Sequence, residues 1–456
     1  MSADRIPPPV AALFPDRGTR ERVEDRLTRA LAEAVERVLQ GPVTPDLDAA
    51  ELRRELTAFD FARAQPLEEV IDWVIERLER GTTHVTHPCH FGSFGPHPNF
   101  PSQCADRISG AFNPQLATAG AAPGPVAIEQ HVIRAMALRA GLPEDSAGFF
   151  TGSGSDANYA ALVCALTRAD ARFGDEGVRA FDGAVAMYVS RECEAPWHRI
   201  AHRSGIGRSA LRLIATDGTG RMDARALAEA VREDRRRGTV PVLVAATAGT
   251  AGAGMIDPLE PCATIARECN IWYHIDAGWG GAALCSDRLR AELAGIELAD
   301  SLMIEAHTWL AATTGCGLFI TREPAILGEA FRVGTEMQGP SHFMGLKLFL
   351  SLAAAGWHGY GAHVERALQV TTCAEARLRA RGWSIVNDSP LAVLCVQPPA
   401  GSAPAREIVR KVLASGRAWV GVARYEGDEV VRICATHGEA TIADVDELVA
   451  ALEAAR

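Results

Sequence analysis

Between residues 149 and 322, short apolar runs alternate regularly with helical stretches. The runs are rich in β-branched residues, whereas segments such as 222–237 and 258–269 carry apolar residues at helical spacing. This alternation predicts a mostly parallel sheet with helices on both faces, and ligands bound at the carboxyl ends of its strands. The predicted strands are 184–190, 211–215, 240–247, 271–276, 301–306 and 317–321.

The segments on either side of this region have different patterns. Residues 19–40 and 66–80 place apolar residues at helical spacing, which predicts a helical arm. After a long helical segment at about 343–380, short strands return together with two helices. We therefore expect an α/β chain in three parts: a helical arm over 1–82, a large α/β domain over 83–342 and a small α+β domain over 343–456.

Composition excludes two broad classes of function. The formal net charge of −11 and the lack of a strongly basic stretch argue against a nucleic-acid surface. No apolar run reaches the roughly 18–20 residues that a membrane-spanning helix requires. The 11 cysteines are scattered without CxxC pairs, so we expect reduced thiols and a cytoplasmic protein.

The segment 149–162, FFTGSGSDANYAAL, is a glycine- and serine-rich turn that runs into a predicted helix. Backbone N–H groups of such a turn, together with the positive end of the helix, can hold a phosphate without any cation. The same pattern is often only a helix N-cap. Its interpretation therefore depends on the rest of the sequence.

Five separated motifs between about 85 and 450 resemble those of group II pyridoxal-phosphate-dependent amino-acid decarboxylases, which have fold type I. The turn at 149–162 resembles the family's phosphate loop. Four other segments resemble family motifs in the same order: VAATAGTAGAGMIDPL, IWYHIDAGWGG, EAHTW, and the C-terminal VVRICATHGEATIADVDELVAALEAA. The resemblance implies a mainly parallel seven-stranded sheet and a homodimer, in which the arm at 19–80 clasps the partner.

The resemblance also implies roles for single residues. Gly154, Ser155 and Thr247 would hold the phosphate of pyridoxal phosphate or pyridoxamine phosphate. Asp276 would keep the ring nitrogen protonated, which lets the ring accept electrons. His307 would lie beside the cofactor. From the residues alone, Asp276 also suits a cap for the next segment, and His307 also suits a hydrogen-bonded core histidine.

Two residues are weaker candidates for substrate binding. His90 lies in a segment similar to one that lines the family's substrate pocket, and Arg432 would face a substrate carboxylate or pair with a surface acid. His90 also belongs to a run of four histidines, which raises the question of a metal. We predict no metal site there, because neither a carboxylate nor a cysteine completes a known spacing for His84, His87, His90 and His97.

The chain departs from the family pattern at three places. Thr308 stands where the family has its Schiff-base lysine, and the chain's two lysines, Lys347 and Lys411, are poor substitutes. Glu194 stands where the family has a histidine that stacks on the cofactor. The stretch around 332–344 is short and lacks the loop tyrosine that protonates the product. Three coordinated departures indicate natural divergence rather than one laboratory substitution.

Three hypotheses are consistent with these departures. The first is a lyase or transferase with altered chemistry, which binds pyridoxal phosphate or pyridoxamine phosphate non-covalently and is no ordinary decarboxylase. It would act on an amino acid or an amine-derived small molecule, with His307 moving protons. The second is a cofactor-free enzyme performing hydrolysis, acyl transfer or condensation with a polar set of Glu194, His307 and Thr308, to which Asp276 could be added. The third is a pseudoenzyme that pairs with an active homologue through the dimer surface.

Overall fold

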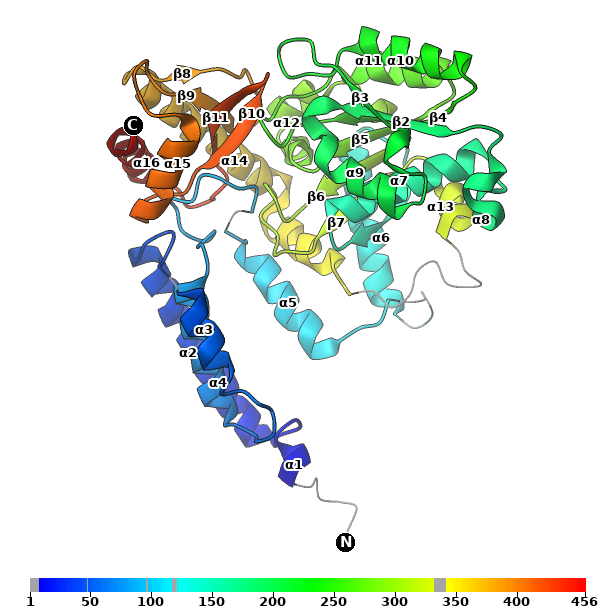
Figure 1. Cartoon of the computed structure of the whole chain (residues 1–456). Helices are drawn as coiled ribbons and strands as arrows, with labels where there is room; N and C mark the ends of the chain where they lie inside the picture. The colour runs from blue at the N-terminus through cyan, green and yellow to red at the C-terminus, as the bar shows by residue number, and fades with distance from the viewer. Residues whose placement is uncertain (1–7, 47, 96, 117–119, 121, 332–341) are drawn as a thin grey trace.

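A computed structural model describes residues 8–331 and 342–456, except for 47, 96, 117–119 and 121. Three units are visible in Figure 1: a helical arm that projects away from the rest, a large unit with a central sheet, and a smaller unit with a second sheet. Among the described helices, none combines the length and apolar character needed to cross a membrane. The limits of the three predicted domains remain a prediction.

The central sheet has seven strands in the order β1-β7-β6-β5-β4-β2-β3. The neighbours from β3 to β6 are parallel, whereas β7 runs antiparallel to both β6 and β1. The predicted α/β class and the mainly parallel seven-stranded sheet are therefore confirmed. The strands are β1 Ala147–Thr151, β2 Val185–Ser190, β3 Leu211–Ile214, β4 Val240–Thr247, β5 Trp272–Ala277, β6 Ser301–Glu305 and β7 Gly317–Thr321.

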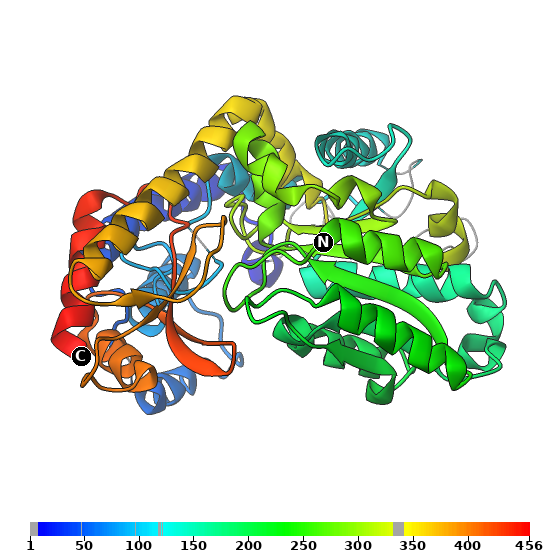
Figure 2. The ribbon, with the colours of Figure 1, turned by 90° about the horizontal axis from the view of Figure 1, so that it is seen from above.

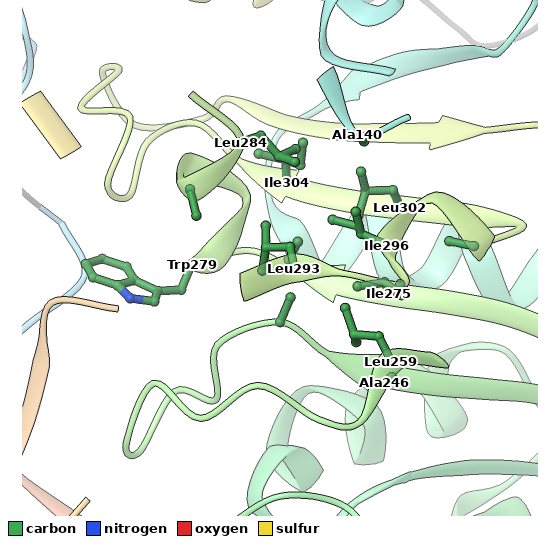
Figure 3. Packing of buried hydrophobic residues seen from close by; sticks show 14 of the residues in the cluster. Ala140, Ala246, Leu259, Ile275, Trp279, Leu284, Leu293, Ile296, Leu302 and Ile304 are labelled. Carbon is green, nitrogen blue, oxygen red and sulfur yellow. The ribbon is translucent and has the colours of Figure 1, made fainter. Parts of the chain in front are cut away.

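Alternate residues of each strand belong to cores on opposite faces of this sheet. In β4, Val244 and Ala246 pack in one core, and Leu243 and Ala245 pack in the other. Figure 3 shows the first core, in which Leu259 lies near Ala246 and Ile275, and Ile304 lies beside Leu284. The helices α6 Pro123–Arg139, α10 Ala224–Arg236 and α11 Leu259–Glu268 cover this face, and α7 Gly154–Ala169, α9 Glu194–Arg203 and α13 Pro324–Phe331 cover the other.

The smaller unit is built on a four-stranded antiparallel sheet in the order β10-β11-β9-β8. The long helix α14, Gly345–Arg379, runs from the large unit to this one (Figure 2). It bends at Gly356, whose positive φ of 62° interrupts the helical backbone. The other elements are β8 Ser384–Ile385, β9 Val393–Gln397, β10 Gly421–Tyr425, β11 Asp428–Cys434, α15 Ala405–Ser415 and α16 Ile442–Ala455.

The N-terminal arm is a helical hairpin that keeps apolar side chains exposed. Its two long helices lie side by side and are linked by an ion pair between Arg37 and Glu79 at 2.6 Å. Leu31 and Val35 on the first helix, and Leu78 on the second, are 47%, 48% and 59% exposed. The arm contains α1 Pro8–Ala11, α2 Arg17–Gln40, α3 Ala49–Leu56 and α4 Leu67–Gly81, and α5 Phe100–Phe112 follows it.

A directed chain of buried hydrogen bonds ties α7 to β5 and β6. Trp272 Nε1 donates to Ser301 Oγ, and the Ser301 hydroxyl donates to His274 Nδ1. On the other side of the ring, His274 Nε2 donates to Asn158 Oδ1. The amide nitrogen Nδ2 of Asn158 then donates to Asp276 Oδ2. Each bond measures 2.8 Å. The direction is fixed because the indole only donates and an amide oxygen only accepts. Burial lowers the pKa of His274 to about 3, so its ring is neutral, as the chain requires.

We predict that Asn158→Ala lowers the free energy of unfolding by about 2–4 kcal/mol, because it leaves the buried His274 N–H and one Asp276 oxygen without this partner. Urea denaturation followed by circular dichroism measures the change. Gln115→Ala, which removes an exposed amide side chain, is the control and should stay within about 0.5 kcal/mol of the wild type. A loss below about 1 kcal/mol for Asn158→Ala would show that the chain is not a structural requirement.

Candidate functional site

A cleft of about 880 Å³ opens between the large and small units. Its floor is formed by the carboxyl ends of β4, β5 and β6 and by the beginning of α7, and its opposite wall comes from β10 and β11. These carboxyl ends of the strands are where the sequence predicts a ligand. Six residues predicted from the sequence line the cleft: Gly154, Ser155, Thr247, Asp276, Thr308 and Arg432.

Asp276 lies at the end of β5 and receives two hydrogen bonds, from Asn158 Nδ2 at 2.8 Å and from the backbone N–H of Gly278 at 3.1 Å. The surrounding protein removes water from the carboxyl group and raises its pKa to about 6; the nearby charge of Glu305 adds to the rise, and the two hydrogen bonds oppose it. Two hydrogen bonds therefore fix the Asp276 carboxyl group in a position that faces the cleft. Sequence reasoning identified Asp276 but missed Asn158.

Thr308 lies on the segment that follows β6, and its side chain is nearly buried. Its hydroxyl lies within hydrogen-bond distance of two backbone carbonyl oxygens, that of Gly278 at 2.8 Å and that of Glu305 at 2.7 Å. The hydroxyl proton is directed to the backbone rather than to an imidazole. This geometry gives no support to a Thr308 nucleophile activated by His307.

The His307 ring turns toward β7 and is not among the residues that line the cleft. Its Nδ1 accepts a hydrogen bond from the backbone N–H of Cys316 at 3.3 Å, so the proton of the neutral ring is on Nε2. That Nε2 lies 3.6 Å from Oε1 of Glu305. His307 therefore contacts the site through Glu305, and its predicted catalytic role remains a prediction.

Glu305, the last residue of β6, was not singled out from the sequence. Its carboxylate accepts a hydrogen bond of 2.6 Å from the backbone N–H of Gly154, the first residue of α7. An acidic residue bound to the N-terminus of a helix is stabilised by the unpaired N–H groups and by the helix dipole. Glu305 thus holds one donor of the turn that was predicted to bind phosphate.

Thr247 and the turn before α7 are fixed by the backbone around them. The side chain of Ser153 caps α7 by accepting from the backbone N–H of Asp156. The backbone N–H of Thr247 donates to Oδ2 of the buried Asp257 at 2.8 Å. The N-cap interpretation of the turn is therefore correct, and it is compatible with an anion at the adjacent amides.

Arg432 projects from β11 into the cleft wall. Its guanidinium donates to the Cys434 thiol at 3.2 Å and lies 4.4 Å from the centre of the Phe94 ring. These contacts place a cation opposite the strand ends, where a carboxylate of a ligand can meet it. The role in substrate binding that the sequence suggested remains a prediction.

His90 lies outside the cleft lining. It is buried and stacks on Trp419, with ring centres 4.9 Å apart, and burial lowers its pKa to about 4. Within the described part of the chain, no three histidine, cysteine or acidic side chains gather into a set that could hold a metal ion. His90 therefore does not line the cleft, although it lies close enough to Arg432 for the charge of the guanidinium to contribute to its lowered pKa.

Two predictions fall wholly or largely on residues that are not described. Glu194 begins α9, between Cys193 and Ala195, which both line the cleft, but its side chain lies outside the description. Of the shortened loop at 332–344, residues 332–341 lie outside the described part of the chain. The role of Glu194 and the consequence of the short loop therefore remain predictions.

Both lysines of the chain lie away from the cleft lining. Lys347 donates to the carbonyl oxygen of Thr314 at 2.6 Å and lies 3.3 Å from Asp106. Lys411 is on α15 and pairs with Glu407 at 3.4 Å. The cleft lining therefore contains no side-chain amine that could form an imine with an aldehyde.

These residues fit only part of a pyridoxal phosphate molecule. Asp276 suits a ring nitrogen because a hydrogen-bonded chain holds its carboxylate in place. The phosphate position is different, because the Gly154 N–H already binds the Glu305 carboxylate. The Gly154 N–H is therefore not available to a phosphate in this arrangement, and the cleft lining contains no lysine.

Comparison with known proteins gives a consistent family. Residues 52–397 match the model of the pyridoxal-dependent decarboxylase conserved domain. The chain is 26% identical to an aromatic-L-amino-acid decarboxylase of Bacillus atrophaeus over 91% of its length and 90% of that protein's. It is 28% identical to a tyrosine decarboxylase of Oryza sativa subsp. japonica, over 82% of this chain and 77% of that one.

Solved structures support the fold type I architecture. The crystal structure of an Oryza sativa protein, TDC, with pyridoxal phosphate and tryptamine superposes with a TM-score of 0.90. The match covers 97% of this chain and 99% of that one, at 22% identity. The family match spans three quarters of the chain, and the fold agrees with it. This chain belongs to the pyridoxal-dependent decarboxylase family.

Proposed function

We propose that this chain is a diverged member of its family, one that acts on an amino acid or an amine-derived small molecule without ordinary decarboxylation. One observation carries the proposal: the cleft lining contains Thr308 and no lysine. Pyridoxal phosphate or pyridoxamine phosphate is then held only non-covalently, with Asp276 facing the ring nitrogen. The altered chemistry belongs to the lyase or transferase class, and the free thiols of all 11 cysteines agree with a cytoplasmic location.

The substrate class is supported by the charges that line the cleft. Arg424 of β10 and Arg432 of β11 lie on the wall opposite the strand ends, and Asp276 and Glu305 lie on the floor. An amino acid carries one carboxylate and one ammonium group, so it can pair with both surfaces at once. The relatives from Bacillus atrophaeus and Oryza sativa are named as decarboxylases of aromatic amino acids and of tyrosine.

A second candidate is an enzyme that uses the same cleft without a cofactor. The contact between Glu305 and Gly154 favours it, because the chain itself supplies an anion at the position of a phosphate. Hydrolysis, acyl transfer or condensation would then depend on the carboxylates of the floor and on Glu194 and His307. Binding experiments with pyridoxal phosphate distinguish this candidate from the first.

The arm supports a further part of the proposal, a homodimer. Leu31, Val35 and Leu78 expose apolar surface on a helical hairpin that projects from the body of the chain. Exposed apolar surface of this kind is typical of a protein interface. A pseudoenzyme paired with an active homologue would use the same surface.

We predict that the protein with added pyridoxal phosphate releases carbon dioxide from standard amino acids at least about 1,000-fold more slowly than the Bacillus atrophaeus relative, because loss of the amine removes several kcal/mol of transition-state stabilisation. Radiometric release of carbon dioxide measures the rate. Thr308→Lys should form an imine with pyridoxal phosphate, which borohydride reduces to a stable adduct that mass spectrometry detects. The wild type should form no such adduct.

Thr308→Ser is the control, because it keeps the hydroxyl that bonds the carbonyl oxygens of Gly278 and Glu305. It should behave like the wild type in both assays. Rapid carbon dioxide release by the wild-type protein, or a stable adduct on one of its two lysines, would contradict the proposal.

For the dimer, light scattering after size exclusion should give twice the chain mass at micromolar concentration. Leu78→Glu should shift the protein toward monomer, because it places a charge in an apolar contact. Val178→Glu changes a similarly exposed apolar residue, 41% exposed and remote from the arm, and should leave the mass unchanged. A wild-type monomer would refute the prediction.

A further inference from the structure

The contact between Glu305 and Gly154 joins two rigid elements of the large unit. Glu305 ends a buried strand in the middle of the sheet, and Gly154 begins a helix of 16 residues. The Oε1 atom of Glu305 lies 2.6 Å from the Gly154 nitrogen, which is short for a bond to a backbone amide and typical of a charge-assisted one. The strand β6, which carries Glu305, and the helix α7, which begins at Gly154, together fix the carboxylate at the first turn of α7.

The space in front of Gly154 is filled by side chains of β6. A methyl group built on Gly154 would lie 2.8 Å from Oε1 of Glu305 and 2.9 Å from the terminal carbon of Met303. Met303 and Glu305 are two residues apart on the strand, so they face the same side. An external anion therefore cannot approach this amide unless Glu305 withdraws.

The electrostatic surroundings of Glu305 agree with this position. The helix N-terminus and the Nε2–H of His307, 3.6 Å away, both present positive charge density to the carboxylate. Asp276 lies close enough for the charge of Glu305 to raise its pKa. A phosphate entering here meets two carboxylates and finds one of its amide donors taken.

We propose that Glu305 is a specificity-determining residue, which occupies the phosphate position at α7 and weakens the binding of phosphorylated ligands to this cleft. The inference deepens the proposed function and rests on it for the choice of ligand. A pyridoxal ring that reaches Asp276 makes no contact with the Gly154 amide, so Glu305 acts on it only through the smaller effect of its charge on Asp276. Removing the charge of Glu305 should therefore strengthen the binding of the phosphate and leave the binding of the ring almost unchanged.

The test is calorimetric titration of full-length wild type and Glu305→Gln with pyridoxal phosphate and with pyridoxal, which lacks the phosphate. We expect Glu305→Gln to bind pyridoxal phosphate about tenfold more tightly, because a neutral amide competes less well for the Gly154 N–H. Pyridoxal should bind both proteins within about twofold, because its contacts do not include that amide. Glu426→Gln is the matched control, since it removes the same charge from the cleft wall without touching Gly154.

Inorganic phosphate separates the failure of this inference from the failure of the proposed function. If neither protein binds a pyridoxal compound, phosphate should still raise the melting temperature of Glu305→Gln and not that of the wild type. That result supports the inference while the cofactor part of the proposed function fails. Glu305→Asp, whose shorter side chain withdraws the carboxylate from Gly154, gives a second variant if Glu305→Gln does not fold.

Two results would overturn the inference. One is equal affinity for pyridoxal phosphate in the wild type and Glu305→Gln, with no effect of phosphate on either melting temperature. The other is an equal gain in Glu426→Gln, which would mean that only the total charge of the cleft matters. A crystal structure of Glu305→Gln soaked in phosphate should show the anion at the Gly154 amide.

Discussion

The floor of the cleft depends on the hydrogen-bonded chain from Trp272 to Asp276. Each donor in it faces an acceptor, so removing one member leaves a buried donor or acceptor of its neighbours without that partner. The chain connects two neighbouring strands to α7 and therefore fixes where the helix begins. Because α7 begins beside the end of β6, the same constraint brings Gly154 within reach of Glu305. The position of the predicted phosphate turn is thus a consequence of the buried chain behind it.

Most strands of the large sheet could be predicted because each is marked by a short run of apolar residues in the local sequence. Six of its seven strands follow runs of apolar, β-branched residues, and burial on both faces requires such runs. β1, Ala147–Thr151, was not predicted as a strand, because it passes directly into the glycine-rich turn and its last three residues were assigned to that turn. The bend of α14 at Gly356 was also missed, since a single glycine in a long helical pattern is usually tolerated. The strand ends, in contrast, correctly located the cleft.

The interactions within the site were less predictable because they join residues far apart in the chain. Glu305 and Gly154 are separated by 151 positions, and Asn158 and Asp276 by 118. Nothing in the local pattern around Glu305 distinguishes it from a solvent-exposed acid at the end of a strand. His307 was assigned to the cleft from its position in a motif, but its ring follows the backbone toward Cys316. Side-chain direction at a strand end depends on packing, which spacing alone does not specify.

On the proposed function, Glu305 and Thr308 act on different parts of one ligand although they lie three residues apart. With Thr308 in place of a lysine, no amine is present at this position to form an imine with an aldehyde. Glu305 competes for the backbone N–H of Gly154 that would hold a phosphate. Either change alone would leave one strong attachment in place, and the two together leave mainly the ring contact at Asp276. Restoring a lysine at position 308 therefore supplies a covalent bond to a ligand whose phosphate still meets a carboxylate. On this proposal, the two residues of this short segment would alter ligand binding while the buried hydrogen-bonded chain, and with it the fold, remains intact.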